Sequence, residues 1–371
     1  MYIHEKDFFK RDNKFENFLN DLENNKIDVF LWGAGQGADW AIRLLRSYHI
    51  EPIAIIDKDA TKHGKSKMSV QIVSLEYVLD YRKERNIRVL IAAPKYEREI
   101  YHYITNFFDE KEIVSFECEL YCHFVRDIAS YRAYLEKNQQ QLLQLSNMFE
   151  DGLSKKTLDN VIMGRLTGDL SYFKEVCVDN QYFPCDIIQL SESESILDIG
   201  ASIGDTLKDI VKTTNGKFNK IWCFEPEIKS VECLKKNINE LGFSNIQVIQ
   251  KGAWDKNITL CFQADYEHGA SRIIEDVNSD KTYIDVVRID NLIKENITYI
   301  KMDIEGAELN AIKGAERIIK ENKPTLAICV YHKNEDLLNI ASAIKALVPE
   351  YKLYLRHHNV SGTETVLYAK L

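Results

Sequence analysis

Two stretches of the chain share one local pattern, and this repetition constrains the fold more than any other feature. In each, an apolar strand leads into a glycine-rich turn, a helix and a second strand that ends in an acid. The first comprises residues 29–32, the turn GAGQGA, a helix to about residue 45 and residues 53–57. The second comprises residues 196–199, the turn GASIGD, a helix over about 206–212 and residues 221–225. Such βαβ units build parallel sheets that bind ligands beyond the carboxyl ends of their strands.

The alternation of strands and helices continues to the end of the chain. Strands are predicted at residues 246–249, 284–289, 299–303 and 325–330, with a helix over 307–320. Two short strands, 352–356 and 365–369, are separated by HHNVSGTE, which is typical of a hairpin loop. We therefore predict an α/β protein with two Rossmann-like domains, the second of which finishes in an antiparallel strand pair.

A helical segment separates the two units. Residues 127–149 have apolar side chains at helical spacing and a glutamine-rich polar face. A shorter helix follows over about 154–165, with Ser154 expected as its N-cap. These features predict an N-terminal domain over residues 1–125, a helical linker over 126–153 and a C-terminal domain over 154–371.

The charge balance excludes some classes of function. The 371 residues include 48 Lys and Arg and 57 Asp and Glu, a net charge of −9, so no overall positive field attracts nucleic acid or an anionic membrane. No stretch approaches the ~20 apolar residues of a membrane span. The N-terminus is too polar for a secretory signal. We expect a cytoplasmic protein without a nucleic-acid partner.

The eight cysteines fit a reduced, cytoplasmic protein. Several lie in apolar runs, where cysteine packs as a small hydrophobic residue. Cys118, Cys122 and His123 have part of a metal-binding pattern, but their spacing lacks a second pair of ligands. We therefore predict that they pack, and we assign no metal ligands from the sequence.

Acids at both ends distinguish the second glycine turn from a phosphate site. Gly200 and Gly204 let the backbone approach a ligand closely. Asp198 and Asp205 would repel a pyrophosphate, which prefers bare amides at a helix N-terminus. The sulfonium and ammonium groups of S-adenosylmethionine, in contrast, suit acidic neighbours. We therefore predict that this turn, including Ser202, binds S-adenosylmethionine.

The next two strand ends supply further predicted cofactor contacts. Glu225 ends its strand, where a carboxylate can accept hydrogen bonds from both ribose hydroxyls. Gly252, Ala253 and Trp254 follow the third strand, where the small residues leave room for an adenine ring. Stacking on the ring and packing in the core are equally expected for Trp254.

A second group of acids follows strand 299–303, within IKMDIEGAELNAIKGAE. Asp303 and Glu305 are expected to face the cleft near the reacting methyl group. There they would position a substrate hydroxyl, orient a basic group, or hold a divalent ion with help from a histidine. Glu308, in the first turn of a helix, is expected to be structural.

Methyl transfer to a hydroxyl needs a base as the oxygen attacks. His332 follows a strand and is the leading candidate, because histidine titrates near neutral pH. His357 and His358, after another strand, are the alternatives.

The motifs DIGASIGD, CFEPE and IKMDIEGAELNAIKGAE together resemble the FkbM family of methyltransferases, whose hallmark is the K-x-D-x-E-G-A-E stretch. The upstream segments LSKKTLDNVIMGRLTGDLSYF and QYFP are similar to the lead-in of many members, so the resemblance covers about residues 150–371. It implies a class I methyltransferase fold and methyl transfer from S-adenosylmethionine, commonly to a hydroxyl of a sugar or natural product. It also implies cofactor residues at Asp198, Gly200, Gly204 and Glu225 and active-site residues at Asp303 and Glu305.

The first glycine turn satisfies a dinucleotide-binding pattern. Gly33, Gly35 and Gly37 lie between a strand and a helix, and Asp57 follows at about the expected distance. The segment looks like the Rossmann-like N-terminal domains of enzymes that modify polysaccharides and nucleotide sugars. Three interpretations stay open: a clamp for a nucleotide or nucleotide sugar, a vestigial scaffold, or a dimerisation module.

The sequence therefore predicts an S-adenosylmethionine-dependent methyltransferase that O-methylates a sugar or glycoconjugate precursor. One alternative is an NAD-dependent oxidoreductase that uses the N-terminal turn. Another is a non-catalytic protein that binds a nucleotide or nucleotide sugar. The sequence leaves open the acceptor, methylation at oxygen or nitrogen, the help of a metal, and homodimer formation.

Overall fold

The computed structural model describes residues 10–24, 26–125, 127–265, 270–273 and 282–371. The chain divides into two compact units, and each is described by itself. Unit 1 comprises Met1–Gln139, Lys156–Cys177 and Asn359–Thr363. Unit 2 comprises Gln140–Lys155, Val178–His358 and Glu364–Leu371. None of the helices formed by the described residues is long and apolar enough to span a membrane.

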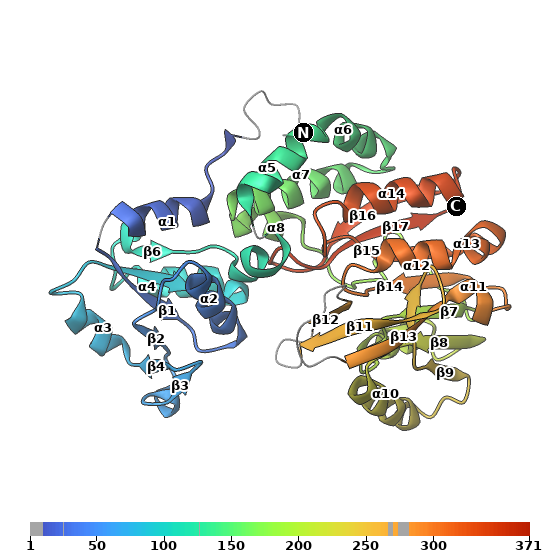
Figure 1. The fold of residues 1–371 in the computed structure, drawn as a ribbon, viewed down its shortest axis with the longest axis horizontal. Helices are drawn as coiled ribbons and strands as arrows, with labels where there is room; N and C mark the ends of the chain where they lie inside the picture. The colour runs from blue at the N-terminus through green and yellow to red at the C-terminus, as the bar shows by residue number, and fades with distance from the viewer. Residues whose placement is uncertain (1–9, 25, 126, 266–269, 274–281) are drawn as a thin grey trace. The chain divides into compact units, whose positions relative to one another are not determined.

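Unit 1 is built on a six-stranded sheet in the order β3-β4-β2-β1-β5-β6 (Figure 1). The strands are β1 (Asp28–Trp32), β2 (Ala54–Ile56), β3 (Ser66–Lys67), β4 (Val70–Val73), β5 (Ile87–Ile91) and β6 (Ile113–Val114). All neighbours are parallel except β3 and β4. The βαβ unit predicted around the first glycine turn is therefore present as β1, α2 and β2.

The helices of unit 1 precede, link and follow these strands along the chain. They are α1 (Lys14–Asn24), α2 (Gln36–Ser47), α3 (Leu75–Tyr81), α4 (Glu97–Ile104), α5 (Ile128–Lys137) and α8 (Leu170–Val176), with short turns η3 (Ala60–Lys62), η4 (Pro94–Tyr96), η5 (Glu110–Glu112) and η6 (Leu120–Phe124). The core on one face of the sheet gathers Phe30, Trp32, Val89 and Ile104, all buried.

The prediction of one continuous helix over residues 127–149 is wrong in one respect. It is two helices, α5 and α6 (Gln139–Met148), separated at Asn138, which leaves helical geometry and caps α5. The next helix, α7 (Gly152–Thr167), begins earlier than predicted. Its first turn is capped by the carboxylate of Asp151, which accepts from the amide of Ser154 at 2.6 Å. Ser154 is therefore not the N-cap, and its hydroxyl instead accepts from the buried guanidinium of Arg356 at 2.9 Å.

Unit 2 is built on a seven-stranded sheet in the order β16-β17-β15-β14-β7-β8-β9 (Figure 1). The strands are β7 (Ser195–Ile199), β8 (Lys220–Phe224), β9 (Ile246–Ile249), β14 (Tyr299–Met302), β15 (Thr325–Cys329), β16 (Lys352–His357) and β17 (Thr365–Lys370). Six of them run in the same direction, and β17, between β15 and β16, runs antiparallel to both of these neighbours. The predicted α/β class with an antiparallel final pair is confirmed.

The helices of unit 2 link these strands. They are α9 (Asp205–Thr213), α10 (Ile228–Leu241), α11 (Ile289–Leu292), α12 (Glu308–Gly314), α13 (Glu316–Asn322) and α14 (Asp336–Leu347). Because β7 and β14 are neighbours at the middle of the sheet, the glycine turn after β7 and the acids after β14 emerge side by side at its carboxyl edge.

A second, four-stranded sheet in unit 2 corrects the predicted strand series. It has the order β10-β13-β11-β12, with β10 (Gly252–Trp254), β11 (Ile258–Asp265), β12 (Ala270–Ile273) and β13 (Thr282–Arg288). The strand predicted at 284–289 lies here and not in the main sheet. It pairs with β11 in antiparallel register, and a pairing between distant segments leaves no trace in local periodicity.

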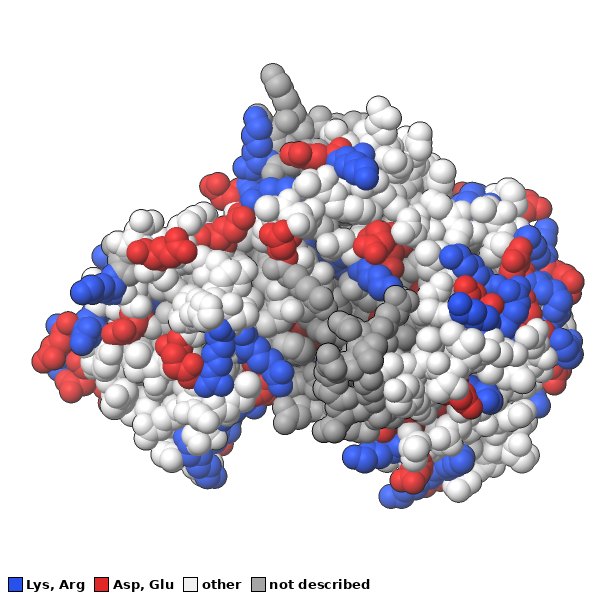
Figure 2. Space-filling view, viewed as in Figure 1, with Lys and Arg blue, Asp and Glu red and all other residues white. Residues whose placement is uncertain are grey.

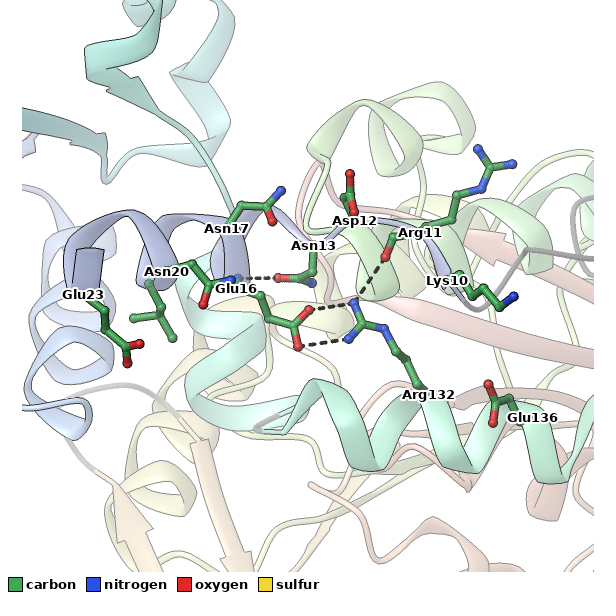
Figure 3. Close-up of a pocket in the computed structure, with 11 residues that line it drawn as sticks. Lys10, Arg11, Asp12, Asn13, Glu16, Asn17, Asn20, Glu23, Arg132 and Glu136 are labelled. Carbon is green, nitrogen blue, oxygen red and sulfur yellow. Dashed lines mark hydrogen bonds and ion pairs between the residues drawn. The ribbon is translucent and has the colours of Figure 1, made fainter. Parts of the chain in front are cut away.

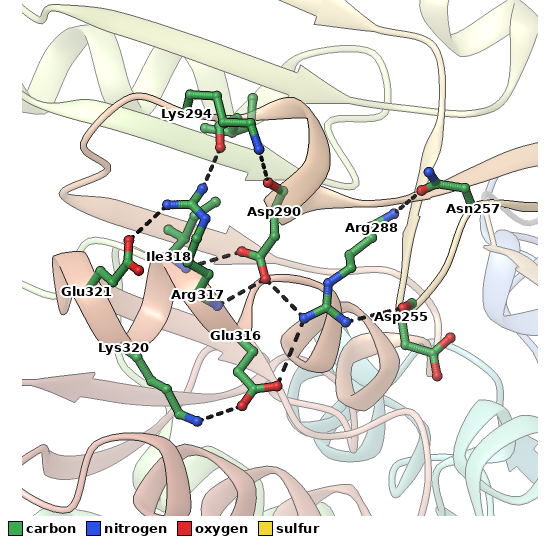
Figure 4. Close-up of polar contacts among 11 residues, drawn as sticks. Asp255, Asn257, Arg288, Asp290, Lys294, Glu316, Arg317, Ile318, Lys320 and Glu321 are labelled. Atoms are coloured by element: carbon green, nitrogen blue, oxygen red, sulfur yellow. Dashed lines mark hydrogen bonds and ion pairs between the residues drawn. The ribbon is translucent and has the colours of Figure 1, made fainter.

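A polar network ties this small sheet to α13 (Figure 4). The buried carboxylate of Asp290 accepts from the amides of Arg317 and Ile318 at 3.0 and 3.1 Å. It also contacts Arg288, the last residue of β13, at 3.2 Å. The cap starts a new helix at this point, so the single helix predicted over 307–320 is the pair α12 and α13.

Candidate active site

The second glycine turn lies directly against the acidic segment after β14. Gly200 has φ +79°, and a Cβ at this position would lie 1.9 Å from the carbonyl oxygen of Asp303. Only glycine fits both the backbone conformation and the contact. Gly204, with φ +87°, precedes α9, and Ser202 also has a positive φ of 46°. The turn is therefore shaped by glycine where the sequence predicts it, and it abuts the second predicted cluster.

Glu225 supports the same turn from the end of β8. Its carboxylate is 8% exposed and accepts hydrogen bonds from the amides of Ser202 and Glu227, both at 2.9 Å. Burial raises the pKa of Glu225, while these amides act in the opposite sense. The carboxylate thus connects the glycine turn to the loop after β8.

In unit 1, Asp57 supports the first glycine turn as Glu225 supports the second, but Asp57 also pairs with a lysine. The carboxylate of Asp57, at the end of β2, accepts from the amide of Ala34 in the first glycine turn at 2.9 Å. Asp57 also forms an ion pair with Lys62 at 3.0 Å. Burial by itself would raise the pKa of Asp57, but the amides of Asp59 and Ala34 and the charge of Lys62 lower it below its ordinary value. This acid is therefore held ionised by groups of its own unit.

The predicted ligand turn of unit 1 is also tightly packed. A Cβ on Gly37 would lie 2.2 Å from the carbonyl oxygen of Ala92, so this glycine is needed for the approach of α2 to the loop after β5. Gly33 has φ +102°, whereas Gly35 caps α2 without a side chain. The fold of unit 1 therefore accounts for Gly33 and Gly37, whereas a Cβ added to Gly35 would meet nothing within 4 Å.

Asp198 is placed differently from its predicted position at the cofactor. Its side chain is 0% exposed and lies 3.1 Å from the ammonium of Lys301 on β14. Lys301 also donates to the carbonyl oxygen of Gly200 at 2.6 Å. Burial raises the pKa of Asp198, and Lys301 opposes this. Sequence reasoning missed Lys301, although it is the first residue of the K-x-D-x-E-G-A-E stretch.

The remaining predicted cofactor residues occupy the rim of the turn and the small sheet. Asp205 is exposed at the first position of α9, and Gly252, Ala253 and Trp254 form β10. Trp254 packs against the buried side chains of Ile284 and Val286. Of the two roles expected for Trp254, packing in the core is therefore the one supported by a contact.

The acids after β14 meet side chains from two other segments. The amide of Asp303 donates to the carbonyl oxygen of Ile199 at 3.0 Å, which continues the β7–β14 ladder. Its carboxylate accepts from the hydroxyl of Tyr182 at 2.8 Å and contacts that of Tyr331 at 3.4 Å. Tyr182 was not predicted as a site residue, although it lies in the QYFP segment, which carried part of the family resemblance.

His332 lies at the centre of this cluster. Its Nε2 is 3.4 Å from Asp303 Oδ1 and 3.5 Å from Glu305 Oε2, and its Nδ1 is 3.1 Å from Glu308 Oε1. Burial would lower the pKa of His332, but Glu308 and Glu305 raise it to about 10. The predicted base needs a neutral ring near pH 7, and this arrangement favours the charged ring.

The carboxylates around His332 have shifted pKa values. Burial raises the pKa of Glu305 to about 7 despite the positive charge of His332. Burial acts on Asp303 in the same sense, yet His332 and Lys301 lower the pKa of Asp303. Glu305 and Glu364 both have positive φ, 56° and 64°. Left-handed backbone in side-chain-bearing residues is costly and clusters at functional sites.

The two alternative histidines are engaged in structural contacts. The ring of His357 is 2.9 Å from the hydroxyl of Thr365. The ring of His358 is 2.9 Å both from the carbonyl oxygen of Val178 and from the hydroxyl of Tyr368. Burial lowers the pKa of His358 to about 4. The structure thus brings His332, Asp303 and Glu305 together and holds the other two histidines in the packing of β16.

A surface pocket of about 640 Å³ in unit 1 lies between α1 and α5 (Figure 3). Its lining is mainly charged and polar, and Arg132 binds Glu16 through two hydrogen bonds at 2.9 and 2.6 Å. This pairing occupies the guanidinium that would otherwise attract an anion.

Basic and acidic side chains are intermixed on the face drawn in Figure 2. Neither sign forms a continuous field there, as a nucleic-acid footprint would require. The view agrees with the net charge of −9.

A family model and a solved structure are similar to this chain. Residues 198–359 match the model of the methyltransferase FkbM domain. A crystal structure of methyltransferase FkbM from Methylobacillus flagellatus KT is 26% identical, with a TM-score of 0.76 over 92% of this chain and 89% of that one. No match is found among curated proteins.

Two further solved structures have low scores. An rRNA methylase from Streptococcus thermophilus is 15% identical with a TM-score of 0.31, over 49% of this chain and 90% of that one. Fibrillarin from Aeropyrum pernix, in complex with S-adenosyl-L-methionine, is 13% identical with a TM-score of 0.32, over 49% of this chain and 70% of that one. Neither supports an argument about this chain.

Proposed function

We propose, from the premise that residues 198–359 form a methyltransferase domain of the FkbM family, that the protein transfers the methyl group of S-adenosylmethionine to a hydroxyl of a sugar or glycoconjugate precursor. The observation that carries the proposal is the close approach of Gly200 to Asp303. A Cβ added to Gly200 would lie 1.9 Å from the carbonyl oxygen of Asp303. This approach sets a nucleoside-type turn against an acidic cluster. A methyl donor and its acceptor need such neighbouring sites, because in-line transfer depends on positioning.

The cofactor side of the site is assigned to the loops after β7, β8 and β9. Glu225 would accept hydrogen bonds from the ribose hydroxyls, while Gly200, Ser202 and Gly204 let the backbone of the turn follow the cofactor. Asp198 acts indirectly: it holds Lys301, which in turn binds the carbonyl oxygen of Gly200 at 2.6 Å. The acidic surroundings favour a sulfonium and disfavour a phosphate.

The acceptor side is assigned to Asp303, Glu305 and His332. These groups lie at the carboxyl edge of β14 and β15, and Asp303 and Glu305 keep 23% and 25% of their side-chain surface exposed. Exposed carboxylates can accept hydrogen bonds from the hydroxyls of a carbohydrate. The proton released by the attacking hydroxyl would leave through this cluster.

Ligand binding and methyl transfer test the proposal together. Thermal unfolding of the full chain should shift upward with S-adenosylhomocysteine and not with NAD, because ligands stabilise the state that binds them. Tritium from methyl-labelled S-adenosylmethionine should then appear in a panel of sugar nucleotides and glycan extracts. A response to NAD alone would favour an oxidoreductase. Binding of S-adenosylhomocysteine without transfer to any member of the panel would remove the carbohydrate acceptor.

Replacing Glu225 by alanine is expected to weaken the binding of S-adenosylhomocysteine. The loss of charge-assisted hydrogen bonds costs about 1.5–3 kcal/mol, which is roughly a 10- to 150-fold rise in Kd. Isothermal titration calorimetry measures it. Asp57→Ala is the matched control, because Asp57 accepts from Ala34 in unit 1 as Glu225 does from Ser202 in unit 2. An unchanged Kd in Glu225→Ala, or an equal loss in Asp57→Ala, would contradict the assignment.

A further inference from the structure

Three side chains of the acidic cluster present donor atoms to one small space. One donor atom from each of Asp303, Glu305 and His332 lies within 4.8 Å of the other two. The two distances from Nε2 of His332 are 3.4 Å to Asp303 and 3.5 Å to Glu305. These separations are longer than direct hydrogen bonds, so the three groups surround a point instead of closing on one another.

The two distances from Nε2 of His332, to Asp303 and to Glu305, match the spacing of donor atoms around a tetrahedral cation. Donor atoms about 2.1 Å from a four-coordinate ion lie about 3.4 Å apart, by the geometry of the tetrahedron. A site with one imidazole and two carboxylates is typical of catalytic divalent metals, which leave further positions open for water or substrate. The partial exposure of Asp303 and Glu305 provides access to those positions.

The surrounding groups orient these donors as they do in metal sites. Oε1 of Glu308 lies 3.1 Å from Nδ1 of His332, which fixes the ring with Nε2 toward the two carboxylates. Tyr182 donates to the second oxygen of Asp303 at 2.8 Å. A carboxylate on the far nitrogen of a ligating histidine is a common partner of bound metals.

Glu308, which pairs with Nδ1 of His332, is itself deeply buried. Its side chain is 0% exposed, and among the described residues its Oε2 is a buried oxygen without a hydrogen-bond partner. Asp336, also buried, belongs with Glu308 and His332 to a second group of close donors. The carboxylates of Asp303, Glu305, Glu308 and Asp336 thus lie around one imidazole. A further positive charge would stabilise such a cluster.

We propose that Asp303, Glu305 and His332 bind a divalent cation, with Glu308 orienting the histidine. The Nε2 side is preferred to the Glu308–Asp336 side because only the former is open to solvent. A cation there would bind and polarise an acceptor hydroxyl beside the methyl donor. The site itself does not depend on the acceptor, so it stands or falls separately from the proposed carbohydrate substrate.

The test is direct cation binding by the full chain. After removal of metals with EDTA and dialysis, the protein is titrated with Mn²⁺, Zn²⁺ and Mg²⁺ by calorimetry, and Mn²⁺ is followed by electron paramagnetic resonance. One equivalent of at least one cation is expected to bind. Glu305→Gln and Asp303→Asn should abolish this binding, and Glu308→Gln should weaken it about 10- to 100-fold.

The controls separate the cation site from the fold and from the cofactor site. Glu240→Gln, an exposed acid of α10, should bind the cation as the unmodified protein does. Binding of S-adenosylhomocysteine and circular dichroism should be unchanged in Glu305→Gln, which keeps the volume of the side chain. No binding of any of the three cations at millimolar concentration would overturn the proposal. Equal binding by Glu305→Gln, Asp303→Asn and the unmodified protein would do the same.

Discussion

Replacing His332 by glutamine is expected to lower the rate of methyl transfer by at least about 100-fold, the range of effects seen for groups that act on a reacting proton or its acceptor. His332 is the centre of the acceptor-side cluster, with Asp303 and Glu305 at 3.4 and 3.5 Å from Nε2. Glutamine keeps a polar group near Glu308 but cannot hold both carboxylates. Transfer of tritium from labelled S-adenosylmethionine to the carbohydrate panel measures the rate.

Binding of S-adenosylhomocysteine should survive this substitution. Glu225 supports the glycine turn through the amide of Ser202, whereas His332 lies among the acids after β14, so calorimetry should give a Kd within about threefold of the original, a difference below 1 kcal/mol. His102→Gln, at an exposed position of unit 1, is the control for the substitution itself. Retained turnover in His332→Gln would remove this histidine from the reaction, and lost turnover in His358→Gln alone would move the role there.

Replacing Asp198 by alanine is expected to lower the free energy of unfolding of unit 2 by about 3–5 kcal/mol, because it leaves a buried charge without its partner. Lys301 is 3% exposed and lies 3.1 Å from Asp198. Without that carboxylate, its ammonium keeps the carbonyl oxygen of Gly200 and the ring of Tyr182, whose centroid is 5.2 Å away, but loses its nearest negative charge. The glycine turn should therefore loosen as well, and cofactor affinity should fall.

Hydrogen exchange by mass spectrometry measures this loss where it occurs. A chain with two compact units does not give one unfolding free energy, so the peptides of β7 and β14 are compared with those of β1 and β5. Protection should fall in unit 2 and stay unchanged in unit 1. The double variant Asp198→Leu with Lys301→Met should recover much of the stability, because apolar pairs often replace buried ion pairs without loss. A double variant as unstable as Asp198→Ala would contradict the ion-pair explanation.

Much of the site follows from local sequence. The positive φ of Gly200 and Gly204 was expected from a turn between strand and helix, and Glu225 was expected at a strand end, where it supports that turn. The cofactor role of Asp198 was predicted from its charge beside the glycine turn and from the family resemblance. Its partner Lys301 lies on another strand, and the register of β7 with β14, which pairs the two residues, is a property of the sheet. A charge predicted to face a ligand is for this reason found in the core.

The helix and strand errors have the same origin. Asn138 interrupts a helix that apolar spacing alone continues, and Asp290 begins a new helix by capping it from a distant segment. The small sheet with β10, β11, β12 and β13 depends on antiparallel pairing between β11 and β13. Periodicity reports which faces of a segment are apolar, and it does not report which segment covers them.

The sequence by itself determined the α/β class, the two glycine turns, the position of the acid Glu225 at a strand end and the acidic stretch after β14. Each depends on dihedral preference, periodicity or charge within a few residues. Only the tertiary structure decided that Asp198 pairs with Lys301 and that His332 meets Asp303, Glu305 and Glu308. Charges on separate strands affect one another only after folding brings them within a few ångströms and removes the water between them. For that reason the pKa of His332 is raised to about 10, mainly by the charges of Glu308 and Glu305 against the effect of burial.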